Sequence, residues 1–299
     1  MMFTVHLIAG LWLAGILQGV DQPPLTAEAI MARVAANQDR SDQLRTEYIY
    51  HQRIHVVLQK ANGTKMRDEL ADYVITPTPT GTQRKLTAIS GYYRHKGQYL
   101  EFKGEPRPDA DSVDGDMLND FRHDLMEDEP RDGVSITIGH TNDKKDDLTE
   151  EHSKDGIARD LFPLTTDQQK DYQFKLMGEG TEQGRAVYRI AFGPKKRSDY
   201  DWAGEADIDA TDFQPVRVYT KLSRPLPFLV RKLVVDLPGL GFNVQYQRQP
   251  EGVWFPTSFG TEFRIHLFMV WGRNVMISLQ NTDFERAHVE HQITYESPE

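Results

Sequence analysis

The sequence predicts a mainly β, α+β protein in which one large antiparallel sheet carries an N-terminal helix against one face. Three observations favour this fold class. About a dozen segments alternate apolar and polar residues with the two-residue period of a strand, short turn signals separate them, and helical period is nearly absent from the second half of the chain. There is no strand–helix–strand rhythm, which excludes a Rossmann fold and a TIM barrel.

The composition sets limits on the class of protein. The chain has 299 residues, 38% of them hydrophobic and 27% charged, so it can bury a sizeable core without metal or disulfide support. Cysteine is absent, which excludes disulfides, cysteine nucleophiles, thiolate metal sites and lipid attachment through an N-terminal cysteine. The net charge of −10 argues against nucleic-acid binding.

The first twenty residues contain no Lys, Arg, Asp or Glu. Their apolar run, Leu7 to Leu17, has the length of a signal-peptide core and is too short to span a bilayer comfortably. We interpret residues 1–20 as a signal peptide and residues 21–299 as one exported domain, located in the periplasm and not lipid-anchored. An uncleaved anchor and a misassigned start are the alternatives.

One helix is predicted, over Thr26–Asn37. Thr26 can cap its first turn, and an apolar stripe at helical spacing is formed by Leu25, Ile30, Met31 and Val34. Because the chain then changes to the two-residue period, we expect this helix to precede the whole sheet.

The strands are expected to form antiparallel hairpins. Asn62-Gly63 and Lys96-Gly97 have the composition of tight hairpin turns. The expected strands are Tyr48–Leu58, Thr64–Thr76, Arg84–Arg94, Gln98–Phe102, Tyr172–Leu176, Tyr188–Phe192, Gly204–Asp209, Pro215–Leu222, Leu229–Asp236, Phe242–Arg248, Val253–Ile265 and Val275–Asp283.

An acidic insert at about 103–165 interrupts this pattern. Between Glu101 and Thr165 there are 19 acidic and 8 basic residues, so the charge of the whole protein is concentrated there. The segment is poor in aromatic and β-branched residues, so we expect a partly flexible, solvated excursion from the domain.

Three segments, in this order along the chain, resemble a known family. They are the strand–turn–strand Tyr172–Lys195, the Ile208-Asp209 strand followed by Phe213-Gln214-Pro215-Val216-Arg217, and the strand that begins Gly252-Val253-Trp254-Phe255-Pro256. After an export signal, a short helix and a long first hairpin, this order resembles the LolA/LolB/RseB-like periplasmic superfamily, which includes bacterial outer-membrane lipoprotein-sorting proteins. The resemblance covers mostly 25–102 and 172–286.

The resemblance implies a half-open β-barrel whose N-terminal helix covers an apolar concave face. Relatives use that cavity to hold acyl chains or to sense lipoproteins and other envelope components. The chain is longer than the small carrier members, carries the acidic insert and shows one helix where carriers have several. A curved sheet with an apolar trough is therefore the property most directly implied.

No catalytic or metal-binding motif is recognisable. A nucleophile elbow needs glycine two residues before its serine, but Ser90 is preceded there by Ala88 and Ser258 by Pro256. His51 and His55 would lie about 13 Å apart on one strand face at ~3.3 Å per residue, too far to chelate one ion. A loose zinc site at His288, Glu290 and His291 is the alternative to a polar C-terminal tail.

Acidic clusters give similarly weak signals. A calcium-like pattern is formed by Asp109, Asp111, Asp114, Gly115 and Asp116, but its glycine comes one position too late for an EF-hand loop. A solvated charge run is the simpler interpretation, with weak calcium binding as the alternative. Asp207 and Asp209 share one face of a strand and are expected to face solvent. We therefore predict no catalytic residues, no metal and no cofactor.

The candidate ligand-binding residues come from two places. In KLSRPLPFLVRK and the segment after it, Leu226, Phe228, Leu229 and Leu240 crowd around proline-containing bends, with cationic residues beside the first bend. Such a bend could form the mouth of the cavity and meet a lipid or membrane headgroup, or it could simply begin the next buried strand. Ile30, Met31 and Val34 of the helix would form one wall.

The leading hypothesis is an exported, non-enzymatic protein that holds a lipid, a lipoprotein acyl chain or another apolar envelope component in the concave face. We expect a monomer that makes peripheral membrane contact and binds no nucleic acid. The second hypothesis is an envelope sensor or interaction module that binds a partner protein, and the third is a hydrolase.

Overall fold

The computed structural model describes residues 25–78, 81–104, 114, 163–196, 202–222, 235–236, 241–267 and 271–287. The elements are α1 (Ala27–Arg45), β1 (Tyr48–Gln59), β2 (Lys65–Thr78), β3 (Gly81–His95), β4 (Gln98–Lys103), the 3₁₀ turn η2 (Gln168–Asp171), β5 (Tyr172–Glu182), β6 (Arg185–Pro194), β7 (Trp202–Asp209), β8 (Pro215–Leu222), β9 (Val235–Asp236), β10 (Gly241–Arg248), β11 (Trp254–Leu267) and β12 (Trp271–Arg286).

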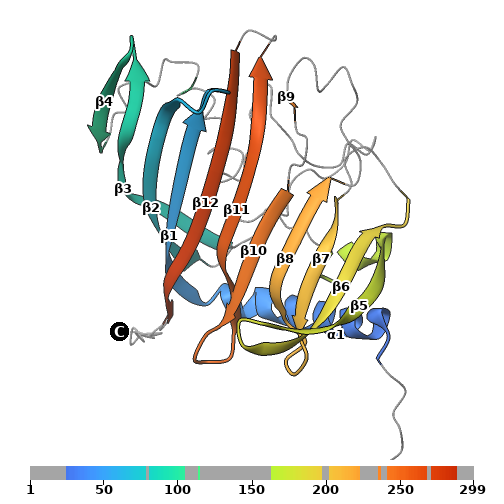
Figure 1. The fold of residues 1–299 in the computed structure, drawn as a ribbon. Helices are drawn as coiled ribbons and strands as arrows, with labels where there is room; N and C mark the ends of the chain where they lie inside the picture. Colours follow the sequence, from blue (N-terminus) through green and yellow to red (C-terminus); the bar gives the residue numbers. More distant parts are fainter. Residues whose placement is uncertain are drawn as a thin grey trace, which may run out of the picture.

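The strands form one curved, unclosed antiparallel sheet (Figure 1). Its order is β4-β3-β2-β1-β12-β11-β10-β8-β7-β6-β5, and the short β9 pairs with β11. At the centre of the sheet the first strand pairs with the last, because β1 runs antiparallel to β12 along nearly its whole length. The predicted fold class is therefore confirmed: a mainly β protein with a large curved antiparallel sheet and one N-terminal helix on its concave side.

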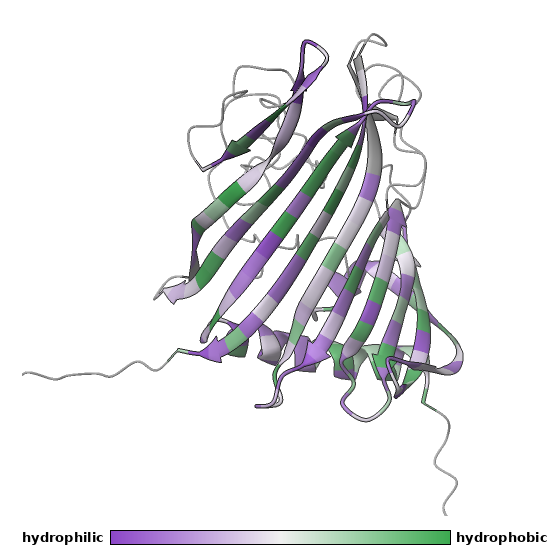
Figure 2. Cartoon of the chain, turned by 60° about the vertical axis from the view of Figure 1, so that its left-hand side comes forward, coloured by the Kyte–Doolittle hydropathy of each residue, from purple (hydrophilic) through white to green (hydrophobic). Residues whose placement is uncertain are grey.

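Alternation of side chains assigns each strand two faces. Along β1 the even-numbered residues from Tyr48 to Leu58 are buried, while His51 and Arg53 between them are exposed. Figure 2 shows the same alternation as hydrophobic and hydrophilic bands along the strands. In the β1–β2 and β3–β4 hairpins the turns fall where the sequence predicts them, and Gly63 and Gly97 adopt φ values of 80° and 87°.

Helix α1 is longer than the sequence predicts. Thr26 caps it as expected, accepting a hydrogen bond from the backbone N–H of Ala29 over 3.2 Å. The helix continues beyond Asn37 to Arg45, because its buried stripe continues with polar side chains. Gln38, Ser41 and Arg45 follow Val34 at spacings of three and four residues, so they lie on the same face although none of them is apolar.

The helix lies across one end of the concave face, where β1, β8 and β11 begin (Figure 1). Ile30, Met31 and Val34 belong to the same hydrophobic cluster as the inner side chains of the sheet. No helix among the described residues is long and apolar enough to cross a membrane.

Candidate functional site

The inner side chains of the central strands form a continuous apolar surface. Cross-strand register places them in rows on the concave face, from β7 through β8, β10, β11 and β12 to β1. We name this surface the apolar floor; it consists of Val56, Leu58, Trp202, Val218, Phe242, Val244, Phe259 and Ile277, and each of these side chains is buried.

Aromatic rings occupy the middle of the apolar floor. The ring of Phe242 lies 5.1 Å from that of Trp202 and 5.3 Å from that of Phe259, measured between centroids. The first pair is edge-to-face and the second is stacked, both favourable geometries. The rings come from β7, β10 and β11, so three strands position one aromatic row.

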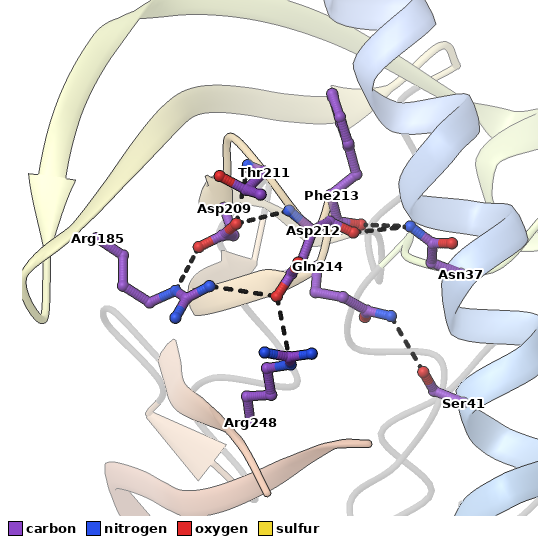
Figure 3. A network of polar contacts seen from close by, with 9 residues as sticks. All are labelled: Asn37, Ser41, Arg185, Asp209, Thr211, Asp212, Phe213, Gln214 and Arg248. Carbon is purple, nitrogen blue, oxygen red and sulfur yellow. Dashed lines mark hydrogen bonds and ion pairs between the residues drawn. The ribbon is translucent and has the colours of Figure 1, made fainter. Parts of the chain in front are cut away.

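A polar network fixes α1 to the sheet at the lower end of the concave face (Figure 3). The side-chain amide of Asn37 donates to the carbonyl oxygens of Asp212 and Phe213 over 2.9 and 3.2 Å. Gln38 bonds to Gln214, and Gln214 donates to the Ser41 hydroxyl over 3.1 Å. We name these contacts the helix latch. They join the polar half of the α1 stripe to the β7–β8 turn.

The turn itself is held in shape by charge. Asp209 accepts hydrogen bonds from the backbone N–H groups of Thr211 and Asp212 over 2.9 and 2.7 Å, and also from Arg185. Burial alone would raise the pKa of Asp209, but the Arg185 hydrogen bond and the two backbone N–H groups hold it below its usual value. The latch therefore binds to a preorganised turn.

At the opposite end of the concave face a buried ion pair interrupts the apolar surface. Arg67 and Glu69 lie two residues apart on β2, and the side chain of each is 1% exposed. The Nε and Nη2 atoms of Arg67 donate to the same oxygen, Oε2 of Glu69, over 3.0 and 2.6 Å. Because Arg67 pairs with Leu58 across β1, the guanidinium adjoins the apolar floor.

Gly91 on β3, which has no side chain, lies between the ion pair of Arg67 and Glu69 on β2 and the aromatic ring of Phe102 on β4. A Cβ on Gly91 would lie 2.1 Å from the carbonyl oxygen of Asp68, so only glycine fits this close approach of the strands. Phe102 then lies with its ring centroid 5.2 Å from Cζ of Arg67, a cation–π distance.

A second buried arginine lies on the same face. Arg273 on β12 is two residues from Val275, which pairs with Leu58, and Arg67 on β2 pairs with Leu58 from the other side, so the two arginines lie on either side of the end of β1. Nε of Arg273 lies 3.0 Å from Oδ1 of Asp114, and Nη2 donates to Oδ2 over 3.1 Å. The two side chains are only 10% and 16% exposed. Asp114 is the described residue of the acidic insert's calcium-like pattern, and its carboxylate lies against an arginine rather than in open solvent.

The opposite, convex face carries a different charge pattern and corrects one expectation. Asp207 was expected to face solvent, but its side chain is 3% exposed because two arginines cover it. Arg189 of β6 and Arg217 of β8 lie 3.1 and 2.7 Å from its two oxygens. The hydrogen bond to Asp207 raises the pKa of Arg217. Asp209 is likewise buried, beneath Arg185.

The predicted ligand-binding residues fall into two groups. Ile30, Met31 and Val34 are 0, 1 and 0% exposed and form the contact between α1 and the sheet. Their assignment as one wall of a ligand site stays a prediction. The residues of the predicted mouth, Leu226, Phe228, Leu229 and Leu240, lie outside the described residues.

Of the candidate metal-binding histidines, some lie within the described part of the chain and others outside it. His51 is exposed, at 61%, with Asp283 3.7 Å away, and His55 contacts Asp68 over 2.7 Å, so neither histidine joins the other in a cluster. In the part of the chain that the structure describes, no group of three or more His, Cys, Asp or Glu side chains could hold a metal ion. His288, Glu290 and His291 lie beyond it.

Sequence reasoning missed the polar members of the concave face. Arg67 and Glu69 occupy the same alternating positions as Ala71, Tyr73 and Ile75, and this shared position was the available signal. This signal was weak, because Leu70, which lies between Glu69 and Ala71, is apolar although it is on the exposed face. Hydropathy alone therefore does not separate the two faces of β2 at this point.

Comparison with known proteins gives matches in structure alone. No protein-family model matches the chain, and no curated protein matches it. A Vibrio parahaemolyticus domain named for outer-membrane lipoprotein sorting is 12% identical with a TM-score of 0.40, covering 89% of this chain and 95% of that one. A LolA superfamily protein from Nitrosomonas europaea is 11% identical with a TM-score of 0.34, covering 91% and 99%.

Another similar structure is the Mycobacterium tuberculosis lipoprotein LppX. It is 9% identical with a TM-score of 0.25, covering 88% of this chain and 98% of that one. One of these similar structures, the Nitrosomonas europaea protein, bears the name of the superfamily that the sequence resembles. The arguments below depend on the chain's own contacts.

Proposed function

We propose that this chain is an exported, non-enzymatic binding protein that holds an apolar or lipidic envelope component against its concave face. The observation that carries the proposal is the apolar floor. It extends without a break across six strands, whereas the helix latch fixes α1 at one end only.

The chemistry of the apolar floor suits a hydrocarbon chain. Aliphatic side chains from β1, β8, β10 and β12 surround the aromatic row of Trp202, Phe242 and Phe259. Each buried methylene of a ligand contributes about 0.8 kcal/mol, so a long acyl chain could gain on the order of 10 kcal/mol before the costs of association. Such a gain needs no catalytic group and no metal.

Ligand entry requires movement, because the floor side chains are already shielded from water. Helix α1 is suited to move as a unit. In the second half of its buried stripe, Gln38 and Ser41 are hydrogen-bonded to Gln214 of the β7–β8 turn, and Arg45 to the carbonyl oxygen of Trp254. Such bonds can be exchanged for bonds to water at small net cost. We infer that α1 forms one wall of the ligand site and that opening the latch exposes the floor.

Export is part of the same proposal, since lipidic envelope components are found outside the cytoplasm. The charge-free apolar run that precedes Gly19 supports it. We expect the protein from native envelopes to begin between Gly19 and Gln22. N-terminal sequencing decides this, and an intact Met1 in a soluble cytoplasmic fraction would contradict export.

The test of the binding function is direct. Protein purified from its native compartment is expected to carry lipid, detected by mass spectrometry of an organic extract, and delipidated protein should bind a fluorescent fatty acid. Phe259→Ala should weaken probe binding, whereas Tyr219→Ala, which removes an aromatic ring that is 41% exposed, should not. Thermal denaturation verifies that both variants are folded.

Two outcomes would contradict the proposal. Protein that is empty and that binds no apolar probe would exclude a carrier. If that empty protein instead purified in a stoichiometric complex with an envelope protein, the interaction-module hypothesis would replace it.

A further inference from the structure

We propose that the end of the concave face formed by β2 and β12 is an oxyanion-binding subsite for the headgroup of an acidic amphiphile, with Arg67 and Arg273 as its ligating residues. This inference rests on the proposed function and adds the class and orientation of the ligand. The headgroup, a carboxylate or a phosphate, would bind near these arginines, and its hydrocarbon part would extend over the apolar floor.

The first argument is energetic. Removing two charges from water costs several kcal/mol each, and a well-packed apolar pair at the same positions is often as stable or more stable. The pair of Arg67 and Glu69 lies beside the aliphatic side chains of Val56 and Leu58 and against the ring of Phe102. Stability therefore does not account for these side chains, whereas recognition of a polar group within an apolar site does.

The second argument is that both arginine positions already bind carboxylates. Arg67 binds Glu69 from its own strand, and Arg273 binds Asp114, which is 159 residues away along the chain. A guanidinium holds a carboxylate or phosphate through directed hydrogen bonds, so Asp114 shows the geometry that a ligand oxyanion would adopt on Arg273. We infer that Asp114 competes with the headgroup for this site.

The third argument is position. Arg67 pairs with Leu58 and Leu58 pairs with Val275, two residues from Arg273, so the two cations flank one end of the apolar floor. The helix latch is at the other end of the strands, at residues 212–214. The concave face thus has cations at one end and apolar side chains along the rest of the strands. A ligand with one charged end and one apolar end matches this arrangement.

The experiment compares one hydrocarbon chain with and without its charge. Delipidated full-length protein is titrated with cis-parinaric acid and with its methyl ester, and fluorescence gives both dissociation constants. We expect the acid to bind about tenfold or more tightly than the ester, which corresponds to about 1.4 kcal/mol. Vesicles of phosphatidylcholine with and without phosphatidic acid then show whether a phosphate is accepted as well as a carboxylate.

Four variants locate the subsite. Arg273→Met, and the double change Arg67→Met with Glu69→Met, should each reduce the preference for the acid and leave binding of the ester unchanged. Asp114→Asn should raise affinity for the acid by several fold, because it removes the competing charge. Arg53→Met is the matched control, since Arg53 pairs with Asp72 on the outer face of β1 and is 59% exposed.

The outcomes separate this inference from the proposed function. Equal binding of acid and ester by the unmodified protein would overturn the subsite and leave the carrier function intact. Binding of neither probe would overturn both. A preference that persists in the Arg273 and Arg67 variants would place the oxyanion elsewhere and overturn the assignment. If Arg273→Met does not fold, Arg273→Lys keeps the charge without the forked geometry and should lower the preference.

Discussion

Breaking the buried ion pair tests whether the concave face has the composition described above. Arg67→Met would remove the guanidinium that is paired with the carboxylate of Glu69, whose side chain is 1% exposed. Removing one member of a buried pair destabilises by about 3–5 kcal/mol. In a domain of this size each kcal/mol lowers the melting temperature by about 2–4 °C, so we expect a decrease of about 6–20 °C.

Replacing both members gives the opposite expectation. With Arg67→Met and Glu69→Met together both charges of this pair are removed, and two flexible apolar side chains adjoin Leu58 and Phe102. The double variant should be as stable as the unmodified protein or more stable, because the desolvation cost of both ions is removed.

The assay is urea denaturation followed by tryptophan fluorescence, with thermal denaturation by circular dichroism as an independent measure. Arg53→Met serves as the control for loss of a cation and should leave the melting temperature nearly unchanged, since its ion pair with Asp72 is exposed. Two results would refute the reasoning: an Arg67→Met variant no less stable than this control, or a double variant as unstable as the single one.

Four further predictions concern the turn, the helix and the mouth. The pKa of Asp209 is lowered in the folded protein. The carboxylate therefore adds its full share to the free energy of unfolding above the ordinary carboxyl pKa of 3.8, and this share is lost as the pH falls further. Asp209→Asn should flatten the dependence of stability on pH below about pH 4. Since the chain has no cysteine, Ser41→Cys with Gln214→Cys can be joined by a short bis-maleimide, which should slow uptake of a fluorescent fatty acid relative to either single variant. Ile30→Asp places a charge where the side chain is 0% exposed and should weaken both folding and uptake. Phe228→Asp, in the predicted mouth, should reduce uptake without lowering stability. If Phe228→Asp unfolds the protein as much as Ile30→Asp does, the bend around Phe228 is ordinary core and not a mouth.

The strands could be predicted because each depends on local alternation and on turn residues. Pro215–Leu222 was expected as a strand and is β8 with the same bounds. The turn expected at Lys96-Gly97 is present, and Gly97 has a φ of 87°, whereas the φ of 48° at Lys96 is a left-handed conformation that its residue type does not predict. The strand expected at Leu229–Asp236 is described only at Val235–Asp236.

The order of the strands could not be predicted in the same way. Neighbours joined by a short turn follow from the sequence, but the pairing of β1 with β12 links Tyr48 to Arg286 through contacts between distant segments. Nothing in either segment alone specifies that partner, because alternation defines a face and not a neighbour. The half-open arrangement came from family resemblance, not from periodicity.

The end of the helix shows why polar members of a buried face escape pattern analysis. Gln38, Ser41 and Arg45 continue the spacing of Met31 and Val34. A hydropathy criterion ends the stripe at Val34, but the spacing itself does not end there. These side chains are buried because each has a partner on the sheet, such as the carbonyl oxygen of Trp254, which accepts from Nε of Arg45 over 2.7 Å.

The same physical reason applies to the two ends of the concave face and links them. Buried polar groups are tolerated only with partners, and those partners come from segments distant in sequence: Gln214 for Ser41, and Asp114 for Arg273. An apolar core alone would need neither contact. In a protein that binds an amphiphile, both contacts have a use. The hydrogen bonds of the helix latch can be exchanged with water when α1 moves. At the opposite end of the concave face, Arg273 can exchange the carboxylate of Asp114 for that of a ligand. Whereas the apolar floor suits the hydrocarbon part of such a ligand, the polar residues at apolar spacing are the features of this sheet that point to its charged group.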